Sequence, residues 1–182
     1  MLRRLGSFFL DIAEVIFFAI GIFLFVYLLI MRPHKISGES MMPNYPNAEY
    51  LLTEKVSYYK KDPQRGDVVV FKPPVSEDEY IKRIIGLPGE AISIKNCLVY
   101  INGQLLSENY ISAGVCTNGG TYLPEGGQII IPESEYFVIG DNRPQSYDSR
   151  SWGLITKKVI TGRAWVIYWP FQNIGVVPSP NY

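Results

Sequence analysis

Two polar residues in this 182-residue chain have the side chains of a nucleophile and a base. Ser40 stands in the segment ISGESMMP (36–43), beside a glycine-containing turn that follows a long apolar run. Lys82 stands in YIKRII (80–85), where apolar surroundings could lower its pKa from about 10.4 so that a neutral amine takes the serine proton. The neighbouring Arg83 cannot act as a base, because its pKa stays above about 12. Taken alone, Ser40 also fits an ordinary turn, and Lys82 fits a surface lysine whose charged end reaches water.

The histidine count restricts the commoner protease arrangements. His34 is the only histidine, so a Ser-His-Asp or Cys-His site would have to use it. One histidine and two cysteines are too few for a zinc site unless carboxylates complete the set. The 17 basic and 17 acidic side chains balance, which gives no indication of a nucleic-acid partner. The composition therefore implies no metal, no cofactor and a hydrolytic site that lacks histidine.

A third polar segment, GDNRPQSYDSRSWG (140–153), follows the strand-like YFVI directly. Its density of Asp, Asn, Arg and Ser is typical of a hydrogen-bonded loop with paired charges, and loops held by a rigid sheet often carry function. The plainer interpretation is a structural turn whose four charged residues neutralise one another. These residues are Asp141, Arg143, Asp148 and Arg150.

The two cysteines leave two interpretations open. Cys97 and Cys116 could form a disulfide if the domain faces an oxidising compartment. They could equally remain two small buried thiols.

Residues 15–31 carry no charge and form an apolar run of the length of a membrane-spanning helix. As a helix the run extends about 26 Å, and starting it at residue 12 brings it close to the thickness of a bilayer core. It is longer than the apolar part of a typical cleavable signal peptide, and no small-residue cleavage site follows it. A buried soluble helix would need a polar face, which this run lacks. The sequence therefore predicts an uncleaved anchor over 12–31, with 1–11 before it and one domain over 32–182.

Short apolar segments bounded by turns dominate the chain after the anchor. Asn102-Gly103 lies between the apolar runs of 98–106, which predicts a β-hairpin. Residues 109–127 are rich in Gly, Ser, Thr and Asn and are expected to form an exposed insertion. No sustained helical periodicity follows residue 31, so we predict a mostly β, antiparallel domain that is partly closed into a barrel-like shape. Other strands are predicted at 50–58, 67–72, 80–85, 91–95, 136–139 and 159–169.

Four segments occur in a fixed order after the single anchor: SGESMMP, RGDVVVFK, YIKRIIGLPGE and GDNRPQSYDSRSWG. In this order they resemble the bacterial type I signal peptidases, and the resemblance covers about residues 12 to 169. One segment alone would be a weak match, whereas four in the family's order make a specific one.

The resemblance implies a role for each matching residue. Ser40 matches the nucleophile, Lys82 the general base and Ser146 a hydroxyl that helps to position the lysine. Gly38 stands where some relatives have a serine that donates to the oxyanion, so the backbone N–H of Ser40 is expected to carry more of that role. Residues implied to support the site are Asp141, Arg143, Asp148 and Arg150. Residues implied to line pockets for small side chains are Ile36, Met41, Tyr80 and Ile81.

The reaction implied by the resemblance is cleavage of signal peptides from exported preproteins after an Ala-X-Ala-like motif. The implied location is the outer face of the cytoplasmic membrane, near the secretion translocon, with the N-terminus in the cytoplasm. Basic residues flank both ends of the anchor, so the residues alone leave this orientation open. The expected partners are signal peptides and the lipid bilayer, and no nucleic acid.

Three other interpretations compete with a general signal peptidase. A peptidase of the same family dedicated to one substrate is not distinguished by the sequence. A self-cleaving Ser-Lys protease of the repressor type is disfavoured by the anchor and the balanced charge. An inactive membrane-tethered scaffold would be expected to lack Ser40 or Lys82, and both are present.

Overall fold

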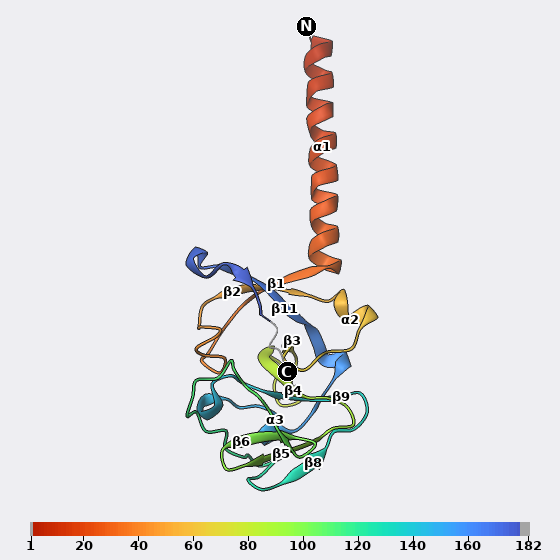
Figure 1. The fold of residues 1–182 in the computed structure, drawn as a ribbon. Coiled ribbons are helices and arrows are strands. Elements are labelled where there is room, and N and C mark those ends of the chain that lie inside the picture. The colour runs from red at the N-terminus through yellow and green to blue at the C-terminus, as the bar shows by residue number, and fades with distance from the viewer. Residues whose placement is uncertain (1, 179–182) are drawn as a thin grey trace.

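The computed structural model describes residues 2–178, without the side chains of residues 2–7, 28 and 29. It confirms a mostly β fold with one long helix at the N-terminal end (Figure 1). Residue 1 of the predicted N-terminal segment, residues 179–182 of the predicted domain, and the side chains of Arg3 and Arg4 lie outside the described part.

Helix α1 (Leu2–Leu29) projects away from the β-domain as a single rod (Figure 1). Its stretch Phe8–Tyr27 has a mean hydropathy of 2.5 and is 0% buried, so by length and composition it can cross a membrane. The helix begins earlier than the predicted anchor and ends before residue 31. Met31 already belongs to strand β1 (Met31–Lys35), which carries a proline that a helix interior would not accommodate.

The large sheet has eight antiparallel strands, in the order β1, β2, β11, β3, β4, β9 and β10, with β12 paired to β11. Strands β3 and β4 pair from Val68 opposite Arg83 to Phe71 opposite Tyr80. Strand β9 pairs with β4 only from Arg83 onward, so residues 80–82 have a strand on one side alone. The bounds are β2 (Tyr50–Glu54), β3 (Val68–Phe71), β4 (Tyr80–Gly86), β9 (Glu135–Ile139), β10 (Ile155–Thr156), β11 (Ile160–Trp169) and β12 (Gly175–Val176).

A smaller sheet lies at the end of the domain that is remote from α1 (Figure 1). Its strands are β7 (Gln104–Leu105), β6 (Leu98–Ile101), β5 (Ala91–Lys95) and β8 (Gln128–Ile130), in that order. The predicted hairpin is present between β6 and β7. Asn102 and Gly103 have φ of 51° and 79°, the left-handed pair that a tight two-residue hairpin turn requires.

The differences from the predicted elements are short segments. The predicted strand 50–58 ends at Glu54, and helix α2 (Ser57–Lys60) follows it. Strands β1, β8, β10 and β12 have two to five residues, too few to show a period-2 pattern. Helix α3 (Ser149–Trp152) and the 3₁₀ turns η1 (Arg143–Gln145), η2 (Lys157–Val159) and η3 (Phe171–Asn173) are single turns, which helical periodicity cannot reveal.

Three clusters of buried apolar side chains form the core. One lies between the two sheets and includes Ile85, Ile92, Val99, Leu123, Phe137 and Ile139. A second packs the segment after β1 against β2, β3 and β11 and includes Ile36, Met41, Tyr45, Leu51, Val68 and Val70. A third includes Val69, Phe71, Ile84, Tyr136, Val138 and Ile155. Strand β3 is buried on both faces, and β4 is buried from Lys82 onward, so the strands beneath the site are rigid.

Residues 109–127 are mostly exposed but are tied firmly to the domain. A disulfide joins Cys116 to Cys97, in the turn between β5 and β6, so of the two interpretations of the cysteines the structure has the disulfide. Thr117 is buried, and Leu123 belongs to the core between the sheets.

Candidate active site

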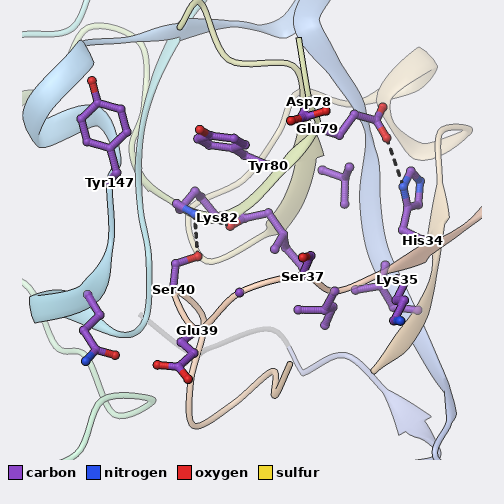
Figure 2. A pocket seen from close by; sticks show the side chains of 16 residues that line it. His34, Lys35, Ser37, Glu39, Ser40, Asp78, Glu79, Tyr80, Lys82 and Tyr147 are labelled. Atoms are coloured by element: carbon purple, nitrogen blue, oxygen red, sulfur yellow. Dashed lines mark hydrogen bonds and ion pairs between the residues drawn. The ribbon is translucent and has the colours of Figure 1, made fainter. Parts of the chain in front are cut away.

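Ser40 and Lys82 meet at a cavity in the β-domain (Figure 2). Lys82 Nζ lies 2.7 Å from Ser40 Oγ and 3.0 Å from the Ile81 carbonyl oxygen. Strand β4 supplies the lysine, and a turn after β1 supplies the serine, 42 positions earlier in the chain. An amine and a hydroxyl at this distance can pass a proton between them when the amine is neutral.

Burial makes the Lys82 amine easier to deprotonate. The residue is only 4% exposed, and this burial lowers the pKa of its ammonium group to about 8. The charges of Asp148 and Asp141 act in the opposite direction, and Arg150 adds to the lowering. The Tyr80 ring lies on the same side of β4, with its centroid 5.3 Å from Nζ. Near pH 8 about half of the Lys82 amine is therefore neutral.

The loop of residues 140–150, here called the active-site loop, holds the turn that contains Ser40. The Asn142 backbone N–H donates to the Ser40 carbonyl oxygen at 3.0 Å, and its side-chain amide donates to the Glu39 carbonyl oxygen at 3.0 Å. No sequence signal distinguishes Asn142, because an asparagine in a turn is common. The sequence analysis predicted a role for its charged neighbours Asp141 and Arg143 instead.

Gly140 lets the active-site loop approach the Ser40 turn closely. A Cβ at this position would lie 2.4 Å from the Ser40 carbonyl oxygen and 2.2 Å from Ser146 Oγ. Only a residue without a side chain fits between these two serines.

Arg83 and Asp141 form a buried ion pair behind the Ser40 and Lys82 side chains. Arg83 Nε lies 2.8 Å from Asp141 Oδ1, and Nη2 lies 2.6 Å from Oδ2, which is a two-pronged contact. The two side chains are 2% and 1% exposed. Asn44 also donates its amide to Asp141 Oδ2 at 2.8 Å. This network joins β4, the active-site loop and the chain just after Ser40.

The remaining charges of the active-site loop do not all pair with each other, as the plainer interpretation assumed. Asp148 pairs with Arg150 at 2.8 Å and accepts the Gly140 N–H at 3.1 Å. Arg143 instead pairs with Glu108, which precedes the 109–127 segment. Asp141, Arg143, Asp148 and Arg150 are all buried, so each is held in one position by its partner.

Ser146 lies next to the site, but its hydroxyl makes no hydrogen bond to a described residue. Its Oγ is buried and unpartnered, close to Gly140. The predicted positioning of Lys82 by Ser146 stays a prediction.

The cavity measures about 720 Å³ and opens between the Ser40 turn and the start of β4 (Figure 2). Ile36, Tyr80 and Ile81, three of the four predicted pocket residues, line it. Met41, which is 1% exposed, is not among the residues that line it. Leu51 and Val70 also line the cavity, and no sequence signal distinguished them from ordinary core residues.

His34 lines the same cavity but its ring is held by other groups. Nε2 lies 3.0 Å from Thr53 Oγ1, and Nδ1 lies 3.2 Å from Glu79 Oε2 (Figure 2 shows the latter pair). Among residues 2–178, no group of three or more His, Cys, Asp or Glu side chains is arranged to hold a metal ion.

Comparison with known proteins gives consistent matches over most of the chain. Residues 9–169 match the family model described as signal peptidase, peptidase S26. The chain is 39% identical over 165 residues to a probable signal peptidase I-2 of Synechocystis, an alignment that covers 87% of this chain and 71% of that protein. It is 37% identical over 169 residues to a signal peptidase I of Bacillus amyloliquefaciens, covering 91% and 90%. A solved signal peptidase I from Enterococcus faecalis is 34% identical, with a TM-score of 0.49 over 57% of this chain and 97% of that one.

Proposed function

This chain belongs to the signal peptidase family S26, and on that premise we propose that Ser40 is its nucleophile and Lys82 its general base. As a member of the family it is a serine endopeptidase that removes signal peptides from exported preproteins. The observation that supports the two roles is the 2.7 Å contact between Ser40 Oγ and the amine of a buried lysine with a lowered pKa.

In the proposed reaction the neutral Lys82 amine takes the proton of Ser40 as Oγ attacks the scissile carbonyl carbon. The lysine then gives this proton to the leaving amine, and the C–N bond breaks to leave an acyl ester on Ser40. Lys82 next takes a proton from water as the water oxygen attacks the ester carbon. It returns this proton to Ser40 Oγ as the C–Oγ bond breaks, which releases the signal peptide and restores the free serine and the neutral amine. The backbone N–H of Ser40 is the proposed donor to the oxyanion, because Gly38 offers no side chain for this purpose.

The proposed substrate motif is a pair of small residues, as in Ala-X-Ala, before the cleaved bond. Apolar side chains of Ile36, Ile81, Leu51 and Val70 form part of the lining of the cavity that Ser40 also lines, and that part of the lining suits methyl groups better than charges. Residues 80–82 of β4 lack a strand on one side, so an extended substrate can pair with this edge.

In this proposal α1 spans the cytoplasmic membrane with its N-terminus in the cytoplasm, and the β-domain acts on the outer face near the secretion translocon. The exposed apolar residues near the end of β11 support contact with the lipid bilayer; they are Trp169, Phe171, Ile174 and Val176. Figure 1 shows this end of β11 on the side of the domain from which α1 leaves. Protease added to intact spheroplasts should digest the β-domain, and protection of the domain would contradict the orientation.

The test of the two roles is cleavage of a preprotein by the purified full chain in detergent. Ser40→Ala and Lys82→Ala should each abolish cleavage while the thermal melt stays cooperative. Ser107→Ala and Lys95→Ala, which alter exposed residues of the same types, are the matched controls and should keep full activity. Substantial cleavage by Lys82→Ala would show that another group activates the serine.

A further inference from the structure

The segment of residues 108–118, here called the clamp segment, contacts the active-site loop through several of its residues. It belongs mostly to the region that the sequence predicts to be an exposed insertion. In the structure it supplies two partners of Arg143, which are Glu108 and Thr117, and one partner of Arg150, and both arginines are buried. An insertion without a role in the site would not be expected to satisfy buried charges there.

Glu108 makes the strongest of these contacts. Its two carboxylate oxygens accept from both terminal nitrogens of Arg143, one of them at 3.0 Å. The guanidinium also donates to Thr117 Oγ1 and, through Nε, to the Gly140 carbonyl oxygen at 3.2 Å. Arg143 is 2% exposed and the Glu108 side chain 13%, so the pair is nearly dry.

A route of direct contacts leads from Glu108 to the nucleophile. Arg143 holds the carbonyl of Gly140, and Gly140 is packed so closely against the Ser40 carbonyl that a methyl group would not fit between them. A displacement of Arg143 would therefore move the surface on which the Ser40 turn rests.

Tyr110 provides a second route, to the strand that carries the base. Its hydroxyl donates to Glu108 Oε1 at 2.7 Å, and its carbonyl accepts from the Asn44 amide at 2.8 Å. The Arg83 guanidinium lies over the Tyr110 ring, 4.2 Å from the centroid. Arg83 directly follows Lys82 in β4. The clamp segment therefore contacts the strand that carries the base as well as the active-site loop.

The Cys97–Cys116 disulfide fixes the far end of the clamp segment. Next to it, the Thr117 N–H donates to the Cys97 carbonyl oxygen at 3.0 Å, and the Asn118 carbonyl accepts from Arg150 at 3.1 Å. Without this covalent link the segment would be held to the turn between β5 and β6 by a single backbone hydrogen bond among the contacts described here.

We propose that Glu108 is a positioning residue for Ser40 and Lys82, acting through Arg143, and that the Cys97–Cys116 disulfide holds Glu108 in place for this role. The proposal rests on the nucleophile and base assigned above. Loss of the Glu108 carboxylate leaves Arg143 buried without its charged partner, so the active-site loop must shift or admit water. Both responses alter the alignment and the hydration of Lys82.

The test compares Glu108→Gln with Glu125→Gln, a matched control in the same region whose exposed carboxylate accepts only the Asn96 N–H among the contacts described. Glu108→Gln should lower kcat by about 10- to 100-fold, because a misplacement of about 1 Å can cost about 100-fold. KM should change by a smaller factor than kcat, since neither Glu108 nor Arg143 lines the cavity itself. Water reaching Lys82 would raise its pKa, so the acid limb of kcat/KM should move to higher pH.

Two further measurements separate positioning from simple loss of fold. Glu108→Asp keeps the carboxylate and should recover part of kcat. Wild-type enzyme treated with a phosphine reductant, with two free thiols counted and a cooperative melt retained, should show the same fall in kcat and the same shift of the acid limb. The double variant Cys97→Ser/Cys116→Ser should start from this lower kcat and not respond to the reductant.

Ser40→Ala is included in the same series. Activity in that variant would overturn the proposed function itself. The positioning role is overturned if Ser40→Ala is inactive but Glu108→Gln matches Glu125→Gln in kcat and pH profile. It is also overturned if Glu108→Gln loses activity only in proportion to its unfolded fraction.

Discussion

Substitution of Gly140 by alanine gives the sharpest test of how the active-site loop supports Ser40. The new Cβ would lie 2.4 Å from the Ser40 carbonyl oxygen, whereas ordinary contact begins at 3.4 Å, so the atoms must separate by 3.4 minus 2.4, or 1.0 Å. Ser146 can rotate its hydroxyl away, but its Cβ, 2.7 Å from the new Cβ, and the Ser40 oxygen move only with the backbone, so the active-site loop and the Ser40 turn must move apart. We therefore expect Ser40 Oγ to move relative to Lys82 by a distance of this order.

A misplacement of about 1 Å can cost about 100-fold in rate, so kcat of Gly140→Ala should fall by about two orders of magnitude. The same overpacking should lower the free energy of unfolding by about 1–3 kcal/mol. The assay is single-turnover cleavage of a preprotein at saturating enzyme, together with a thermal melt. Gly175→Ala is the control, because a Cβ there meets nothing closer than 3.9 Å.

A rate for Gly140→Ala within twofold of the Gly175→Ala rate would refute the reasoning. It would mean that the Ser40 turn does not depend on the close approach of the active-site loop. A loss of rate that vanished at a lower temperature, where the variant is fully folded, would instead assign the effect to stability alone.

Three other predictions concern the base and its surroundings. Because a lysine must lose its proton to act as a base, kcat/KM should rise with pH up to about 8 and then level off, as measured by a pH–rate profile. An acid limb with a pKa near 10.4, the pKa of a free lysine, would contradict the effect of burial. Asp141→Asn removes the charge that pairs with the buried Arg83 and should lower the free energy of unfolding by about 3–5 kcal/mol, measured by chemical denaturation. A free energy of unfolding close to that of the wild type would argue against this role of the ion pair. Ser146→Ala should lose part of kcat, and unchanged kinetics would exclude a positioning role for its hydroxyl.

The candidate site could be predicted from the sequence as far as it depends on the chemistry of single residues. Lysine rather than arginine can serve as a base, and a conventional triad would have to use His34, the only histidine, whatever the fold. The order of four segments then linked Ser40 to Lys82 through a family resemblance. Neither argument contained a distance, so the contact between the two side chains came only from the structure.

The ion pairs that hold the active-site residues in place could not be predicted from the sequence. Arg83 pairs with Asp141, 58 positions away, and Arg143 pairs with Glu108, 35 positions away. Charge counting within the active-site loop suggested that its own acids and bases neutralise each other, which holds only for Asp148 and Arg150. Met41 was expected in the pocket on the same family resemblance as Ile36. Both belong to one core cluster, but only Ile36 also lines the cavity.

Features that depend on local pattern could be predicted from the amino-acid sequence alone. These are the long apolar run at the N-terminal end, the β character of the rest, the Asn102-Gly103 hairpin and the kinds of residue available for chemistry. Period, turn preference and pKa belong to short stretches or single side chains, so they can be read without a fold. Three features became visible only in the folded chain: which charges pair, that the cysteines form a disulfide, and that Gly140 must lack a side chain. Each of these depends on how closely two distant segments approach, and that distance is set by the packing of the whole β-domain.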